Sequence, residues 1–94
     1  MKQLREYFIG IGQVKGFEFT QIEKSSYGYI YAVNTGENIH YEVFKHYENT
    51  RYNTVSYPSN KSFGRWAWTF SDLQKAEDKF DELELLFESK IGLK

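Results

Sequence analysis

The stretch GFEFTQIEKSSYGYIYAVNTGENIHYEVFKHY, residues 16–47, holds three apolar segments separated by two turn clusters. Aromatic and β-branched residues dominate each segment, which predicts strands over 16–23, 29–33 and 39–47. The NTGEN turn at 34–38 is favourable because Asn and Gly adopt positive φ at little cost. Connections this short join antiparallel neighbours, since parallel strands need a long crossover.

Two further strands are expected after residue 47. YNTVSY at 52–57 is a plausible fourth strand, and RWAWTF at 65–70 is a short fifth. Between them, Pro58 removes a backbone donor and the polar residues 59–62 form a loop. The sequence therefore predicts an antiparallel meander of four or five strands over about 16–70.

The C-terminal part of the chain predicts one helix over about 72–90. Its apolar residues recur at spacings of three and four and form one stripe, made of Leu73, Ala76, Phe80, Leu83 and Phe87. Ser71 and Gln74 have the spacing of a capping box, and Gly92 is a natural stop. We expect a single α+β domain over 1–94, with this amphipathic helix packed on one face of the sheet.

Composition excludes several classes of protein. The 94 residues carry 12 Lys or Arg and 13 Asp or Glu, a formal net charge of -1, whereas a dedicated duplex-DNA binder usually has a basic excess. The absence of cysteine excludes disulfides, a thiolate nucleophile and cysteine-ligated metals. No run approaches the roughly 18 apolar residues of a membrane span, and no secretory signal is recognisable. We expect a cytoplasmic protein.

Charge is distributed unevenly. Residues 1–71 carry eight basic and six acidic side chains, a balance of +2, whereas residues 72–94 carry four and seven, a balance of -3. The outer face of the predicted helix is therefore acidic, through Glu77, Asp78, Asp81, Glu82, Glu84 and Glu88. Such a face is usually solvated, and the alternative is a surface that binds a partner or partly mimics nucleic acid.

The predicted strands are apolar on both faces, although one helix can cover only one of them. We expect the small and aliphatic residues Ile30, Ala32 and Ala67 to face the helix, with the reverse arrangement left open. The aromatic residues of the other face either fill the core or form an exposed binding surface. The residues in question are Tyr29, Tyr31, Tyr41, Trp66 and Trp68.

Residues 57–68 form the densest aromatic stretch. The segment either closes the domain and anchors the helix, or presents a binding hot spot, where Trp, Tyr and Arg are enriched. The candidate partner-binding residues from the sheet face and this segment are Tyr29, Tyr31, Tyr57, Phe63, Arg65, Trp66 and Trp68.

These patterns predict a small non-enzymatic interaction or regulatory module that binds a protein partner or a second copy of itself. The alternative is a single-stranded nucleic-acid-binding domain in which exposed aromatic rings stack on bases. Phosphate contacts would then come from Lys45, Arg51, Lys61 and Arg65.

No motif predicts catalysis, a cofactor or a metal ion. His40, Glu42 and His46 share one side of a predicted strand, but its rise places the two histidines about 20 Å apart, too far to share an ion. His40 and Glu42 alone supply two ligands or an acid–base pair without a third group.

The segments YEVF at 41–44, SYP at 56–58 and FGRWAWT at 63–69, followed by the closing helix, form a pattern over most of 14–87. This pattern resembles small uncharacterised accessory proteins of phages and conjugative elements of gut bacteria. The resemblance implies no activity and assigns no role to any residue. It favours a non-enzymatic protein that acts by binding a host or element-encoded macromolecule.

Overall fold

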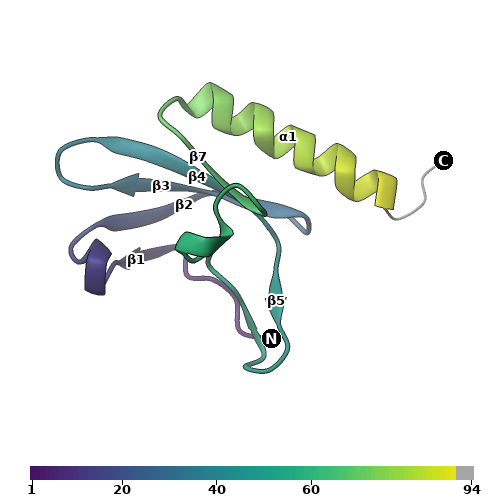
Figure 1. Cartoon of the computed structure of the whole chain (residues 1–94), viewed down its shortest axis with the longest axis horizontal. Helices are drawn as coiled ribbons and strands as arrows, with labels where there is room; N and C mark the ends of the chain where they lie inside the picture. Colours follow the sequence, from purple (N-terminus) through teal and green to yellow (C-terminus); the bar gives the residue numbers. More distant parts are fainter. Residues whose placement is uncertain (91–94) are drawn as a thin grey trace.

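The computed structural model describes residues 1–90 and has an α+β fold, as the sequence predicts (Figure 1). One five-stranded antiparallel sheet has the strand order β1-β2-β3-β4-β7. Its strands are Tyr7–Ile9 (β1), Glu18–Lys24 (β2), Gly28–Asn34 (β3), Ile39–Lys45 (β4) and Ala67–Phe70 (β7). Between β4 and β7 lie a small hairpin, Glu48–Asn49 (β5) with Thr54–Val55 (β6), and a 3-10 turn, Asn60–Ser62 (η2). A second 3-10 turn, Gly12–Val14 (η1), follows β1. The helix α1 spans Leu73–Lys90.

The β2-β3-β4 meander follows the sequence prediction closely. In the first connection, the Ser25 hydroxyl oxygen accepts hydrogen bonds from the backbone N–H groups of Tyr27 and Gly28, each at 3.1 Å. In the second, Gly36 has φ of 94°, a left-handed conformation that glycine adopts without strain. Local turn chemistry therefore sets the register of the central strands.

Two strand predictions need correction. The segment 52–57 is not a strand of the main sheet; only Thr54–Val55 is extended, and it pairs with β5 in a separate hairpin. The edge strand β1 was not predicted, and it pairs with β2 through the register Phe8↔Phe19. Both segments have only two or three paired residues, too few for a periodic pattern to be recognised.

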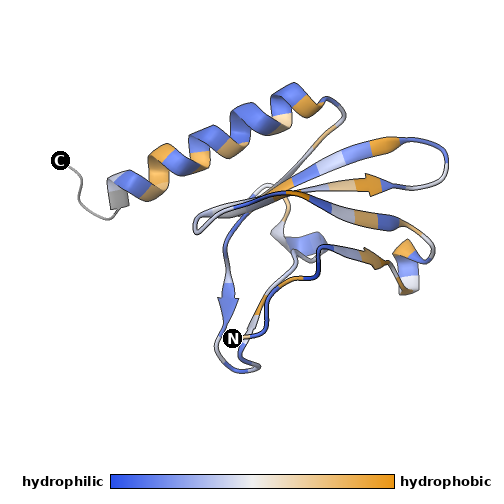
Figure 2. Ribbon diagram, turned by 180° about the vertical axis from the view of Figure 1, so that it is seen from behind, coloured by the Kyte–Doolittle hydropathy of each residue, from blue (hydrophilic) through white to orange (hydrophobic). Residues whose placement is uncertain are grey.

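Helix α1 presents its apolar stripe to the sheet (Figure 2). Ala76, Phe80 and Leu83 are buried against Ile30 of β3 and Val43 of β4. The predicted Ser71–Gln74 capping box is wrong, because the Asp72 side chain caps the helix by accepting the Gln74 N–H at 2.9 Å, while the Gln74 side chain turns to Asp78. The predicted stop at Gly92 lies outside the described residues.

The opposite face of the sheet is also covered. Tyr29, Tyr31, Val33 and Phe44 form a second buried cluster on that face. Figure 1 shows α1 on one side of the sheet, and the N-terminal segment with residues 48–64 on the other. Side chains from these segments pack on the cluster, namely Leu4, Phe8, Val55, Tyr57 and Phe63. The central strands β3 and β4 are therefore covered on both faces.

The predicted orientation of the small residues is partly wrong. Ile30 faces α1 as expected. Ala67 lies in the opposite cluster, and its neighbours Trp68 and Phe70 face the helix instead. The large rings fill the space between α1 and the β7 edge, where the Lys79 ammonium lies 4.0 Å from the Trp68 ring centre. Ala67 is paired with Phe44 of β4, and both side chains belong to the opposite cluster.

A matched pair of leucines in α1 tests this arrangement. Leu83 is 2% exposed against the sheet, whereas Leu85 is 67% exposed. We expect Leu83→Ala to lower the free energy of unfolding by roughly 2–5 kcal/mol, because it leaves a cavity. Leu85→Ala should change it by less than about 0.5 kcal/mol. Urea unfolding monitored by circular dichroism measures both, and equal losses would contradict the packing of α1.

Candidate functional site

Tyr29 and Tyr31 do not form an exposed surface. Both side chains are 0% exposed, so the expectation that they face a partner is wrong. The Tyr31 hydroxyl donates to the Arg5 carbonyl oxygen at 2.6 Å, and the Tyr29 hydroxyl lies 3.2 Å from His46 Nδ1. A buried tyrosine needs such partners, and these tie β3 to the N-terminal segment and to the end of β4.

Tyr57 is a packing centre rather than an exposed hot spot. Its ring lies edge-on to four aromatic rings, with centroid distances of 4.9–5.6 Å, those of Phe8, Phe19, Tyr31 and Phe44. Its hydroxyl donates to Glu42 Oε1 at 2.5 Å. Burial raises the pKa of Tyr57 well above its usual value, and the Glu42 charge raises it further. Tyr57 therefore keeps its proton and remains a donor.

The other candidate residues divide between core and surface. Trp68 is half-buried against α1, and Phe63 is half-buried in the second cluster. Arg65 is exposed, and the half-buried Trp66 stacks on Tyr47 at a centroid distance of 4.8 Å. Tyr47 was not among the predicted site residues; the sequence placed it at the end of a predicted strand, whereas β4 ends at Lys45.

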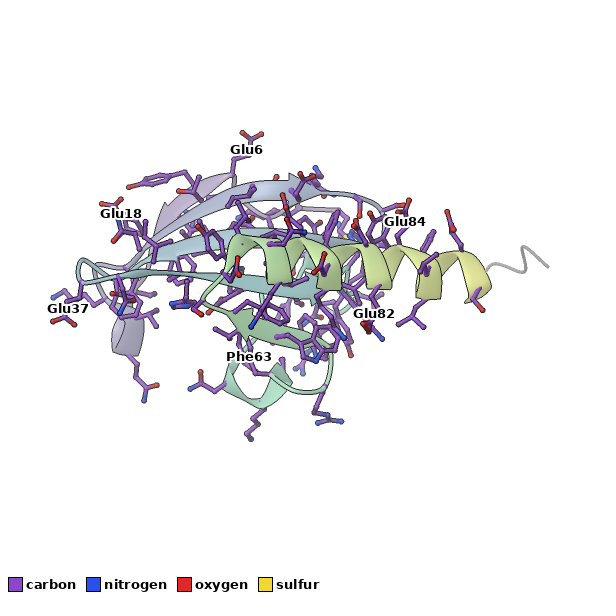
Figure 3. The ribbon with its side chains drawn as sticks, turned by 90° about the horizontal axis from the view of Figure 1, so that it is seen from above. Glu6, Glu18, Glu37, Phe63, Glu82 and Glu84 are labelled. Carbon is purple, nitrogen blue, oxygen red and sulfur yellow. The ribbon has the colours of Figure 1, made fainter. Side chains whose placement is uncertain are left out.

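The last turns of α1 extend beyond the end of the sheet (Figures 1 and 3). A groove lies beside them. It has a volume of about 590 Å³ and lies between α1, the β2–β3 turn and the residues that follow β4. Its lining residues are Ser26, Tyr27, Lys45, His46, Glu48, Leu83, Leu86 and Phe87. Sequence reasoning missed this site, because it depends on how far α1 projects past the strands.

Carboxylates border the groove. Burial raises the pKa of the Tyr27 hydroxyl, and the negative charges of Glu84, Asp81 and Glu23 raise it further. Glu48 lines the groove and lies 3.0 Å from His46 Nε2. Figure 3 shows Glu82 and Glu84 projecting from opposite sides of α1, so the acidic character continues along the helix.

A second cavity opens on the other face of the sheet. It has a volume of about 330 Å³ and lies between β1, η1 and residues 57–63. Most of its lining is apolar or aromatic, including Phe8, Phe19 and Phe63, and Glu42 supplies a carboxylate. His40 Nε2 lies 3.2 Å from Glu42 Oε2, an oxygen that can only accept a hydrogen bond when ionised.

The histidines have separate carboxylate partners, Glu42 for His40 and Glu48 for His46. Within residues 1–90, no three His, Asp or Glu side chains are grouped so that they could hold a metal ion. No helix in this range has the length and apolar character needed to cross a membrane.

Comparisons with protein-family models, with curated proteins and with solved structures find no match to this chain.

The buried tyrosines predict a specific response to alkaline pH. The folded-state pKa values of Tyr29, Tyr31 and Tyr57 are raised, so their contribution to stability is complete below the unfolded pKa of about 10 and is lost above it. Each such tyrosine adds up to about 1.4 kcal/mol per pH unit to the loss.

Urea unfolding between pH 8 and 11 tests this point. Above pH 10, the free energy of unfolding of Tyr57→Phe should fall less steeply with pH than that of the wild type. The difference in slope should correspond to at most one proton. Tyr52→Phe is the matched control, because Tyr52 is exposed, and its slope should equal that of the wild type. Equal slopes in all three proteins would contradict the burial of Tyr57.

Proposed function

We propose that the chain is a small non-enzymatic binding module of the cytoplasm. Its partner is a protein segment that docks in the groove beneath the projecting end of α1. This role fits the resemblance to accessory proteins of phages and conjugative elements, which favours action through binding.

The exposure of apolar side chains around the groove carries this proposal. Leu86 lines the groove and is 46% exposed, and Phe87 beside it is half-buried. The sheet covers the apolar stripe of the first part of α1. The last part of α1, which carries Leu86 and Phe87, has no strand beneath it. Exposed apolar side chains gathered at a concave site are typical of an interface.

Charge complementarity indicates the chemistry of the partner. Glu48 lies on the groove lining together with Lys45, and Glu84, Asp81 and Glu23 lie close enough to Tyr27, another lining residue, to raise the pKa of its hydroxyl. A segment with an apolar anchor and flanking Lys or Arg residues matches this pattern. A second copy matches it less well, because two-fold docking would place the two acidic borders against each other.

The exposed Tyr47 and the half-buried Trp66 stacked on it extend the same surface. The Lys45 N–H donates to the Trp66 carbonyl oxygen at 3.0 Å, which joins the groove to this pair. Arg65 is exposed beside Trp66. Of the predicted candidates, Arg65 is therefore exposed to a partner, and Trp66 is exposed in part.

Single-stranded nucleic acid is the alternative, and the acidic border disfavours it. Phosphates approaching the groove would meet the helix carboxylates. Tyr29 and Tyr31 are also buried, so neither ring can stack on a base. Trp66 with Tyr47 is a smaller platform than a strand of bases requires.

Selection from a random peptide library displayed on phage tests the proposal. We expect the wild type to enrich peptides that combine apolar residues with Lys or Arg. Leu86→Ser should weaken binding of those peptides by roughly tenfold or more, because it removes a groove anchor. Leu85→Ser is the matched control on the same turn, outside the groove lining, and should bind as the wild type does.

Three outcomes would contradict the proposal. The first is peptides that bind Leu86→Ser as tightly as the wild type. The second is a light-scattering mass of a dimer rather than of the 11.2 kDa monomer, together with a return to the monomer mass in Leu86→Ser. The third is binding of a single-stranded oligonucleotide that weakens steeply with salt, which would support the alternative.

A further inference from the structure

The cavity between β1, η1 and residues 57–63 has the features of a small-molecule site. Its volume of about 330 Å³ falls within the range of about 300–1,000 Å³ that is usual for such sites. The chain folds tightly around it at Gly10, where an added Cβ would collide with the Val14 carbonyl oxygen. This close approach sets η1 against the Phe19 ring and shapes one wall.

Glu42 is the distinctive polar group of the cavity. Its side chain is 14% exposed, and its two oxygens contact Tyr57 and His40. A carboxylate offers about four acceptor positions, so these contacts leave acceptor capacity. In the part of the chain that the structure describes, no Lys or Arg forms an ion pair with Glu42. A largely buried carboxylate without a fixed cation attracts one.

The surrounding rings also favour a cation. Phe8, Phe19, Tyr57 and Phe63 line the cavity, and the faces of aromatic rings attract positive charge. The Arg5 guanidinium already lies over the Phe8 ring, 5.4 Å from its centre, at the wall of the cavity. The Glu42 carboxylate would repel an anion, and a neutral ligand would leave its negative charge without a compensating cation.

We propose that this cavity binds a small organic cation, a protonated amine or amidine attached to an apolar or aromatic body. The charged nitrogen contacts Glu42, and the apolar body lies against Phe8 and Phe63. Tyr57 and His40 position the carboxylate through their hydrogen bonds. This site lies on the other face of the sheet from α1, and it is independent of the protein-binding groove.

The test uses three probes with the same phenyl ring and different charge: 2-phenylethylammonium, 2-phenylethanol and phenylacetate. We titrate each into the labelled wild type and follow the chemical shifts by NMR. The ammonium should bind roughly tenfold or more tightly than the alcohol, because it adds a charge-assisted hydrogen bond. Phenylacetate should bind more weakly than the alcohol.

Glu42→Gln keeps the shape of the side chain and removes its charge. It should bind the ammonium and the alcohol with equal affinity. Glu18→Gln is the matched control, since Glu18 is an exposed carboxylate on β2, and it should keep the wild-type preference. A preference for the ammonium that survives Glu42→Gln would overturn the proposal.

A measurement on the wild type alone keeps the test independent of the folding of the variant. The ammonium should shift the methyl signals of Ile9, Ile11 and Val14, which line the cavity, and leave those of Leu86 unchanged. Shifts confined to Leu86, or no shifts at any concentration, would overturn the proposal.

Discussion

The packing of Tyr57 against the sheet is the interaction on which the rest of the structure depends. Its ring contacts Phe8, Phe19, Tyr31 and Phe44, which come from four strands that lie side by side in the sheet. Edge-on aromatic pairs of this kind contribute about 0.5–1.5 kcal/mol beyond their buried area. The hydrogen bond to Glu42 fixes the hydroxyl end of the ring. Together these contacts hold the segment that connects β4 to β7 against the face of the sheet that α1 does not cover.

Covering both faces determines where the molecule can bind anything. The broad aromatic face is core, so both proposed sites lie at its margins. The first is the groove under the projecting end of α1, with Leu86 and Glu48 on its lining. The other is the cavity beside β1 and η1, where Glu42 faces aromatic rings. The two linings share no residue, so the two proposed sites are separate.

The sequence predicts the elements better than it predicts how they combine. The helix stripe and the turns around Ser25 and Gly36 are local signals, and the structure confirms them. Whether Tyr29 and Tyr31 are covered depends on Tyr57, which is distant in sequence, and alternation along a strand does not reveal this contact. A strand of three residues such as β1 leaves no periodic signal. Leu86 and Glu42 acquire their significance only from the projection of α1 and from the folding of residues 57–63.

Nitration of tyrosines by tetranitromethane under native conditions tests most directly whether the second face of the sheet is closed. Peptide mass spectrometry after a short reaction identifies the modified residues. We expect modification of the exposed tyrosines, Tyr7, Tyr47 and Tyr52, and protection of the buried Tyr29 and Tyr31. Nitration of Tyr31 at the rate of Tyr52 would show that the aromatic face is open, and would contradict this account of both binding sites.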